Sequence, residues 1–512
     1  MVALSPPFQR FARSSLAQPG YVPVSKSTRP VVTIITPFFN TGKVFEQTRE
    51  CVLGQSLQQW KWLIVNDASD DHISLAALDT VRRRDPRITV LDQPERRGPS
   101  AARNLAARLA DTPYLAFLDS DDLLEATALE KMVWCLESHP EWAMCKGHTV
   151  AFGEQTYVSR VGFGRSWLFL DRNPITLTAV VRKEAFEAIG GFDEAMKAGL
   201  EDWDLWLRFA SHGYWGYTIP EVLDWYRRRR THADRWGLWT RGGVGKVRRR
   251  LRRAYPDLYR RGIPIIPERE FDPSESLRED SPFQNLLEPA GRQLWLLPAA
   301  EVADQVESLA EVLPEETYNT TIVLLQGQRR DRGDSILGEA AEVFTLSSFL
   351  HVADYARFLL YLLDSRDFER VMIWESPLTL PLYPLLRAHY ADRVFLRAGP
   401  DNIRPLVGAL PFEVVECLPA GGKALETITV SEQEPLATAR HLARNVAAEC
   451  AKHRDVREVQ AQGLSMLQNA DGLAKLGRLS IFIFLLSERL RTLGGRIRGA
   501  LSPGVAKEGR CA

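Results

Sequence analysis

The sequence lacks any hydrophobic run that approaches the roughly eighteen residues of a membrane-spanning helix. Residues 1–28 contain no apolar segment of the kind found in a signal peptide. The six cysteines form no C-x-x-C pair, which argues against a zinc knuckle or a disulfide framework and favours a reducing compartment. Net charge is also absent, because 65 basic residues balance 65 acidic ones, so we expect no nucleic-acid partner. Together these absences predict a cytoplasmic protein.

At 512 residues the chain is too long for one hydrophobic core. Short apolar runs alternate with helical patterns in two stretches, which predicts two α/β domains on parallel sheets. We expect an N-terminal arm at 1–29, a first α/β domain at 30–235, a basic segment and linker at 236–290, a second α/β domain at 291–430 and a helical region at 431–512. The Pro-rich composition of the linker predicts that the first domain folds by itself.

The elements of both domains can be placed approximately. In the first domain we expect strands at 31–36, 60–65, 88–91, 114–118, 144–152 and 176–181, with helices at 41–55, 75–84, 98–110, 126–137 and 184–189. In the second we expect strands at 293–298, 320–325, 370–374 and 394–396, with helices at 302–312, 355–365 and 381–389.

The most informative stretch is an apolar run at 114–118 that stops at three carboxylates, Asp119, Asp121 and Asp122. Side chains alternate along an extended chain, so Asp119 and Asp121 point roughly the same way and repel each other unless a cation lies between them. Mg²⁺ or Mn²⁺ suits such hard oxygen ligands and would next bind a diphosphate. The alternative is a solvated acidic turn that caps a helix starting near Leu123.

A second pair of carboxylates, Glu201 and Asp202, opens a helical stretch that contains Trp203 and Trp206. Carboxylates at the start of a helix are favoured by its dipole, so capping alone would explain them. Alternatively, the two tryptophans partly desolvate a carboxylate and raise its pKa toward that of a general base. The residues alone do not decide between these readings.

Two arginine-rich segments follow. Arg227 to Arg230, with His232, could close over a phosphate-rich ligand, whereas the later arginines up to 261 fit a solvated helical face. Near the C-terminus, an apolar stretch at 479–486 is followed by arginines up to 498. That pattern predicts a helix packed within the protein or, alternatively, an interfacial helix that contacts the inner face of a membrane.

Six segments in this order resemble the family 2 glycosyltransferases, which have the GT-A fold. They are TIITPFFN at 33–40, VNDASD at 65–70, GPSAARNLA at 98–106, LDSDD at 118–122, GGFD at 190–193 and EDWDLWLR at 201–208. The resemblance implies an inverting, metal-dependent glycosyltransferase that moves a sugar from a nucleotide-diphospho-sugar to a glycan or glycolipid acceptor. Synthesis of a surface polysaccharide or glycoconjugate is the implied setting.

The resemblance also implies roles for individual residues. A Mn²⁺ or Mg²⁺ ion would be held by Asp121, Asp119 and His232, and Asp202 would be the base, with Glu201 beside it near the acceptor. The donor would be bound by Thr36, Pro37, Asn40, Asp67, Gly98, Arg103, Asn104, Asp119 and Ser120.

The second domain resembles, more weakly, the acceptor-side Rossmann-like half of GT-B glycosyltransferases, at 294–298, 342–346 and 384–389. It has no G-x-G-x-x-G and no P-loop, so we expect it to be non-catalytic. Two other functions stay open on the residues. A nucleotidyltransferase would use the paired carboxylates but leave Glu201 and Asp202 without a role. A non-catalytic glycan-binding or scaffold protein would have no need of a repulsive acidic cluster.

Overall fold

The computed structural model describes most of residues 29–374 and a few positions beyond. The described residues are 29–82, 85–196, 199–229, 243–270, 281–287, 292–299, 319–327, 342–374, 379, 382, 386, 394–397, 415–417 and 426–428. All lie in the first of two compact units, residues 1–448. The arm at 1–28, the helix expected at 302–312, most of that expected at 381–389 and the helical region at 431–512 lie outside the described residues.

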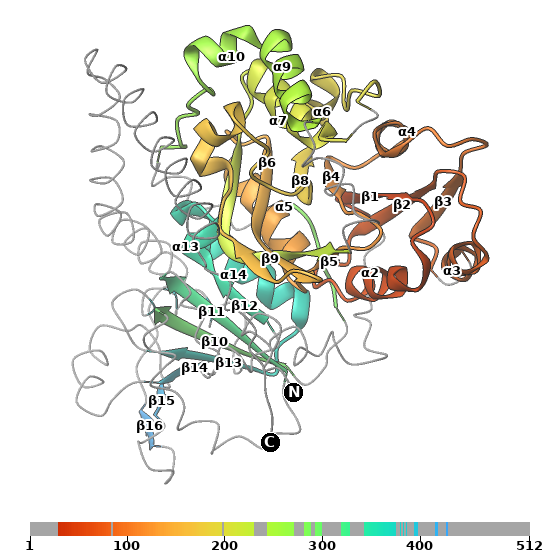
Figure 1. The fold of residues 1–512 in the computed structure, drawn as a ribbon. Coiled ribbons are helices and arrows are strands. Elements are labelled where there is room, and N and C mark those ends of the chain that lie inside the picture. The colour runs from red at the N-terminus through yellow and green to blue at the C-terminus, as the bar shows by residue number, and fades with distance from the viewer. Residues whose placement is uncertain are drawn as a thin grey trace, which may run out of the picture. The chain divides into compact units, whose positions relative to one another are not determined.

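The first domain is built on a nine-stranded sheet in the order β3-β2-β1-β4-β8-β6-β9-β5, with β7 paired to β6 (Figure 1). Its strands are β1 (Val32–Phe38), β2 (Trp60–Asn66), β3 (Ile88–Asp92), β4 (Tyr114–Phe117), β5 (Leu123–Leu124), β6 (Met144–Gly153), β7 (Tyr157–Ser159), β8 (Ala179–Arg182) and β9 (Gly216–Arg228). The strands β1 to β4 pair in parallel, as predicted. The rest departs from the expected parallel sheet, because β8 runs antiparallel to β4 and β6, and β5 runs antiparallel to β9.

Helices cover this sheet close to the predicted positions. They are α2 (Phe45–Leu53), α3 (His72–Arg82), α4 (Pro99–Leu109), α5 (Ala128–Ser138), α6 (Lys183–Ala188), α7 (Glu201–Ser211), α9 (Gly243–Ala254) and α10 (Pro256–Arg261), with 3-10 helices η2 (Gly42–Val44) and η3 (Phe163–Leu170). The end of α6 is set by Gly190 and Gly191, whose positive φ values glycine adopts without strain. Within the described residues, no helix is both long and apolar enough to cross a bilayer.

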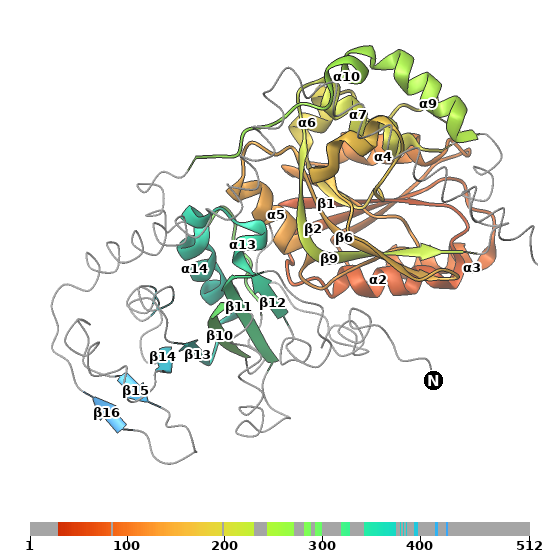
Figure 2. The ribbon, with the colours of Figure 1, turned by 60° about the vertical axis from the view of Figure 1, so that its left-hand side comes forward.

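The second domain contains a five-stranded parallel sheet in the order β12-β11-β10-β13-β14. Its strands are β10 (Arg292–Ala299), β11 (Asn319–Gln326), β12 (Glu342–Thr345), β13 (Arg370–Trp374) and β14 (Val394–Arg397), accompanied by α13 (Leu346–Phe349), η6 (Val352–Asp354) and α14 (Tyr355–Arg366). A separate antiparallel pair joins β15 (Val415–Cys417) and β16 (Glu426–Ile428). Figure 2 shows α13 and α14 between this five-stranded sheet and α5 of the first domain.

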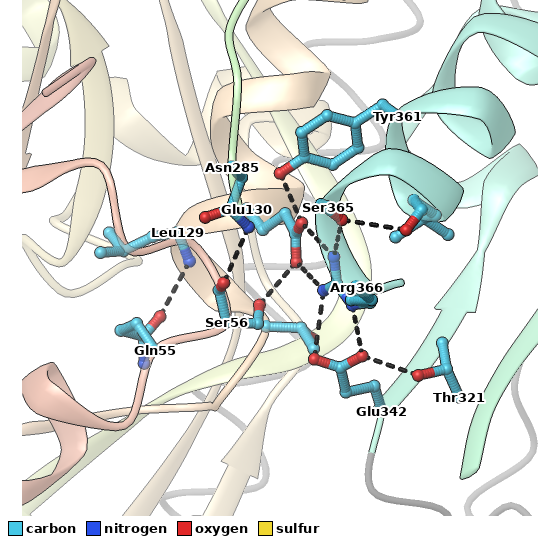
Figure 3. A network of polar contacts seen from close by, with 12 residues as sticks. Gln55, Ser56, Leu129, Glu130, Asn285, Thr321, Glu342, Tyr361, Ser365 and Arg366 are labelled. Atoms are coloured by element: carbon cyan, nitrogen blue, oxygen red, sulfur yellow. Dashed lines mark hydrogen bonds and ion pairs between the residues drawn. The ribbon is translucent and has the colours of Figure 1, made fainter. Parts of the chain in front are cut away.

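A buried ionic network joins α5 to the second domain (Figure 3). Arg366 of α14 is fully buried and donates to Glu130 of α5 (2.6 Å) and to Glu342 at the start of β12 (2.7 Å). The Tyr361 hydroxyl also lies 2.6 Å from Glu130, and the Thr321 hydroxyl lies 2.8 Å from Glu342. A buried charge without its partner is costly. Separation of α5 from the second domain would therefore destabilise both.

The segment expected to be a linker is packed where the structure describes it. The ring of Phe283 contacts Trp134 of α5 and Tyr361 of α14. Asn285 is almost fully buried; its Oδ1 accepts from the backbone N–H of Gln58, and its Nδ2 donates to the carbonyl of Ser56. These contacts contradict a flexible linker at 281–287 and argue against independent folding of the first domain.

Candidate active site

The strands of the first sheet lead into a cleft of about 740 Å³. Open α/β sheets bind ligands at the carboxyl ends of their parallel strands, so the topology explains the location of the cleft. Its lining comes from the segments after β1, β2 and β4, the starts of α4 and α7, and parts of β6, β7 and β9. Among the predicted site residues, the lining includes Pro37, Asn40, Asp67, Arg103, Asp119, Ser120, Asp121, Glu201 and Asp202.

Asn40 and Asp67 organise the ends of β1 and β2. The Asn40 amide donates to Asp70 Oδ1 (2.6 Å), and its carbonyl accepts from the Asp70 backbone N–H (3.0 Å). Asn40 has a φ of +46°, in the left-handed region that asparagine adopts more readily than most residues other than glycine. Asp67 accepts from the backbone N–H groups of Arg97 (2.6 Å) and Gly98 (2.9 Å). Asp67 therefore fixes the loop that leads into α4 and also faces the cleft.

Arg103 connects the two acidic motifs. Gly98, with a φ of +91°, and Pro99 start α4, and Arg103 follows one turn later. Arg103 is 3% exposed and donates to Asp119 Oδ1 (2.6 Å) and to Glu201 Oε1 (2.9 Å). One buried guanidinium thus holds the acidic turn after β4 against the start of α7, although these motifs lie about eighty positions apart in the chain.

The carboxylates of Asp121 and Asp122 have different surroundings. Asp122 is buried and accepts from the backbone N–H of Arg227 (2.8 Å). Burial, followed by the nearby Asp121 and Asp119, raises the pKa of Asp122 well above its usual value. Asp121 pairs with Arg229 (2.7 Å), and burial raises its pKa although that arginine opposes the shift. The acidic turn is therefore held by backbone and arginine contacts, which a solvated capping turn would not need.

Asp119 and Asp121 fit a divalent cation by their donor chemistry. Each gives one carboxylate oxygen to an arginine, and its other oxygen has no hydrogen-bond partner among the described residues. Carboxylate oxygens suit Mg²⁺ or Mn²⁺, which usually keep water and substrate phosphate as further ligands. The described part of the chain has no group of three or more His, Cys, Asp or Glu side chains arranged to hold a metal. These two aspartates would therefore need a bound diphosphate to complete the coordination.

Asp202 lines the cleft and has a raised pKa. Its Oδ2 accepts from Asn173 Nδ2 (2.6 Å) and its Oδ1 from the backbone N–H of Trp203 (2.9 Å). Burial, and then the adjacent Glu201 carboxylate, raise the pKa of Asp202 to about 7. Leu200, directly before α7, has a φ of +59°, so the chain is strained where it presents these carboxylates to the cleft.

The two tryptophans of α7 have different positions. Trp203 lines the cleft, and its Nε1 donates to the carbonyl of Phe169 (2.6 Å). Trp206 packs instead against Phe163, with 5.4 Å between ring centroids, and is absent from the cleft lining. The expectation that both tryptophans flank the base is therefore wrong for Trp206.

A buried polar group lies under the cleft and was not anticipated from the sequence. Lys146 of β6 is fully buried, 3.1 Å from the hydroxyls of Thr149 and Thr176 and 3.6 Å from Asp224 of β9. Burial lowers the pKa of Lys146 and raises that of Asp224. The only sequence signal was a lysine within a run expected to form a strand. Asn173, the partner of Asp202, likewise lies in a stretch that had no motif.

Three predicted site residues are not part of the cleft lining, and a fourth is not described by the structure. Thr36 is buried and accepts from Trp62 Nε1 (2.9 Å), so its side chain serves the core. The Asn104 amide bonds to the Phe192 backbone and also lies outside the cleft lining. Gly98 precedes the lining residue Pro99 and is not itself part of the lining. His232 lies outside the described residues.

Comparison with known proteins identifies the domain. Residues 33–190 match the family model described as Glycosyl transferase family 2. EpsE of Bacillus subtilis (strain 168), which is named as a glycosyltransferase, is 27% identical to this chain over 199 residues. The match covers 38% of this chain and 72% of EpsE. TuaG of the same organism, named for teichuronic acid biosynthesis, is 29% identical over 204 residues, or 39% of this chain and 79% of TuaG.

A solved structure is also similar in part. The mannosyltransferase PcManGT from Pyrobaculum calidifontis, determined with GDP-Man and Mn²⁺, is 23% identical, with a TM-score of 0.33 over 44% of this chain and 65% of that one. At that score the likeness has no bearing on mechanism. The family match and the named relatives show that this chain is a glycosyltransferase with a family 2 domain at residues 33–190.

Proposed function

We propose that this glycosyltransferase is inverting and metal-dependent. Its donor would be a nucleotide-diphospho-sugar and its acceptor a glycan or glycolipid in surface polysaccharide or glycoconjugate synthesis, as the name of TuaG suggests for that relative. The observation that carries the proposal is the Arg103 bridge, because it joins the carboxylates suited to a donor site with those suited to an acceptor site in one cleft. A cytoplasmic location is part of the proposal.

The reaction requires charge stabilisation and a base. Asp121, with Asp119, would hold the Mn²⁺ or Mg²⁺ ion, which would neutralise charge on the departing diphosphate. Arg229 and Arg227 line the same side of the cleft and would add positive charge there. Asp202 would take the proton of the attacking acceptor hydroxyl. Direct attack on the anomeric carbon by the acceptor inverts its configuration without a covalent enzyme intermediate.

The second domain is proposed to be Rossmann-like and non-catalytic. Its parallel strand order supports the Rossmann-like assignment. The strand β10, first in the chain, is central, and β11 and β12 continue to one side. Its proposed likeness to the acceptor-side half of GT-B enzymes would suit contact with the acceptor. The described contacts of Arg366 give it a structural role in addition.

Calorimetry and donor hydrolysis test the proposed reaction. A panel of UDP-, GDP- and dTDP-sugars with Mn²⁺ should reveal at least one donor that binds and is slowly hydrolysed, with both properties lost in EDTA. Asp121→Ala should abolish metal-dependent donor affinity while the thermal unfolding midpoint without ligand stays near that of the wild type. Unchanged donor affinity of Asp121→Ala with Mn²⁺ would refute the role of the metal. Failure of every donor to bind would favour the non-catalytic alternative.

A further inference from the structure

The helices α9 and α10 carry exposed charge of almost one sign. Seven exposed basic residues lie on them, against one acid, Asp257. We call this surface the α9–α10 face; its basic residues are Lys246, Arg249, Arg250, Arg252, Arg253, Arg260 and Arg261. The whole chain has a formal net charge of zero, so the face is a local excess rather than a reflection of composition.

The orientation of this face is fixed by the other side of the helices. Val247, Leu251 and Leu258 are buried, so the apolar stripe of both helices is already used inside the domain. The Tyr255 hydroxyl donates to Asp204 of α7 (2.8 Å), and Arg248 pairs with Asp171 after η3 (3.5 Å). The helices are therefore docked and have no apolar side left to insert into a bilayer, and their cations point outward.

The central row of cations has no described partner. Lys246, Arg249 and Arg253 lie at spacings of three and four along α9, which places them on one side of the helix. No hydrogen bond or ion pair joins any of them to another described residue, whereas Arg250 on the same helix pairs with Asp193 (2.5 Å). Like charges at this spacing repel each other, and an external anion would relieve that repulsion.

The form of the face indicates what that anion is. The cations of the face are on the exposed side of both helices, so they can lie together against a planar charged surface. Trp167 of η3 is 49% exposed, and η3 is joined to α9 by the pair of Asp171 and Arg248. Exposed tryptophan together with exposed basic residues is typical of protein surfaces at the membrane interface.

We propose that the α9–α10 face docks the protein on a bilayer that contains anionic lipids. Val244, near the start of α9, lines the cleft, so docking would place this part of the cleft lining near the lipid headgroups. The docking does not depend on the proposed reaction. If that reaction is correct, the position suits an acceptor carried on a membrane lipid. This surface differs from the C-terminal arginine-rich stretch, which lies outside the described residues.

Vesicle sedimentation of the full chain tests the proposal. The wild type should bind phosphatidylcholine vesicles that contain phosphatidylglycerol, should bind pure phosphatidylcholine weakly, and should be released at high salt. Each Lys or Arg near an anionic surface contributes about fivefold to affinity, so Lys246→Gln/Arg249→Gln/Arg253→Gln should bind on the order of 100-fold more weakly. The matched control, Arg82→Gln/Arg108→Gln/Arg370→Gln, removes the same charge from exposed positions outside the face and should bind like the wild type.

Three results would overturn the proposal. They are no preference of the wild type for anionic vesicles, an equal loss in both triple variants, and unchanged binding of the α9 variant. Heparin in place of vesicles distinguishes a soluble polyanion, because binding to heparin that depends on α9, without binding to vesicles, would assign the face to such a ligand instead. Circular dichroism melts of both variants verify that they are folded, and donor binding, which uses other residues, should be the same in all three proteins.

Discussion

Asp202 should control the acid side of the pH–rate profile. Its pKa is about 7, raised first by burial and then by Glu201, whereas an ordinary aspartate titrates near 3.9. A base acts only when it is ionised, and at pH 6 a group with a pKa near 7 is about one-tenth ionised. We therefore expect kcat/KM to fall about tenfold from pH 8 to pH 6, and about tenfold more by pH 5. An aspartate with an ordinary pKa would leave the rate nearly constant over that range.

The assay compares Asp202→Asn with a control in the same turn of α7. Asp202→Asn keeps the shape and should lower turnover on the order of 10²–10⁴-fold with donor affinity near that of the wild type. Asp204→Asn is the control, because Asp204 is buried, pairs with Arg208 (2.7 Å) and does not line the cleft. It should lose stability but keep the acid midpoint near pH 7. A wild-type profile that is flat from pH 5 to 8, or normal turnover in Asp202→Asn, would leave helix capping as the role of Asp202.

The pH dependence of the free energy of unfolding is an independent test of the raised pKa of Asp202. The folded-state pKa of Asp202 lies above its unfolded value, so between about pH 4 and 7 the folded protein binds more protons than the unfolded chain. The free energy of unfolding then falls as the pH rises through that window, and the ionised carboxylate is destabilising at pH 8. Each pKa unit corresponds to about 1.4 kcal/mol, and after a reduction for the side that faces the cleft we expect Asp202→Asn to gain roughly 1–2 kcal/mol at pH 8. Urea unfolding at pH 5 and pH 8 measures this, and a loss of stability at pH 8 would contradict the argument.

Two further predictions concern buried arginines. Arg366→Met should lower the free energy of unfolding by roughly 3–5 kcal/mol in urea, because Glu130 and Glu342 would stay buried without a counter-ion. Adding Glu130→Gln and Glu342→Gln should recover most of the loss, and no recovery would show that packing rather than charge is responsible. Arg103→Gln should lower turnover and move the acid midpoint of kcat/KM upward, since Arg103 lowers the pKa of Asp202. An unmoved midpoint would limit Arg103 to positioning the two motifs.

Local sequence patterns were sufficient to predict the first half of the first domain but not the pairing of the strands in its second half. The strands β1 and β2 are short apolar runs followed by turn residues, and both form where that pattern predicted. The strand β9 was missed because its thirteen residues mix polar and apolar side chains and include Pro220. The two-residue strand β5 lies where a helix start was considered, and no two-residue pattern could have indicated it. The mixed sheet follows from these two strands together with β8, so its topology could not be read from the chain.

The candidate site was predictable where its chemistry is concentrated in the sequence. Asp119, Asp121, Glu201 and Asp202 stand in dense acidic motifs, and all four face the cleft. Their partners come from distant segments without a motif, as with Asn173, which is 29 positions from Asp202. Sequence spacing fixes which side chains share a strand or a helix face, but only the tertiary fold determines which counter-charge meets which carboxylate.

The second domain reaches the site through the two elements that frame it. Glu130, the partner of Arg366, lies on α5, the next helix after the acidic turn. Lys131 of α5 pairs with Glu221 of β9 (2.7 Å), and Glu221 also accepts from Ser348 of α13. The strand β9 ends in the arginines that contact the acidic turn. The helix α14 therefore supports α5, which follows that turn, and α13 supports β9, which supplies positive charge to it. The second domain would therefore determine how rigidly the acidic turn is held.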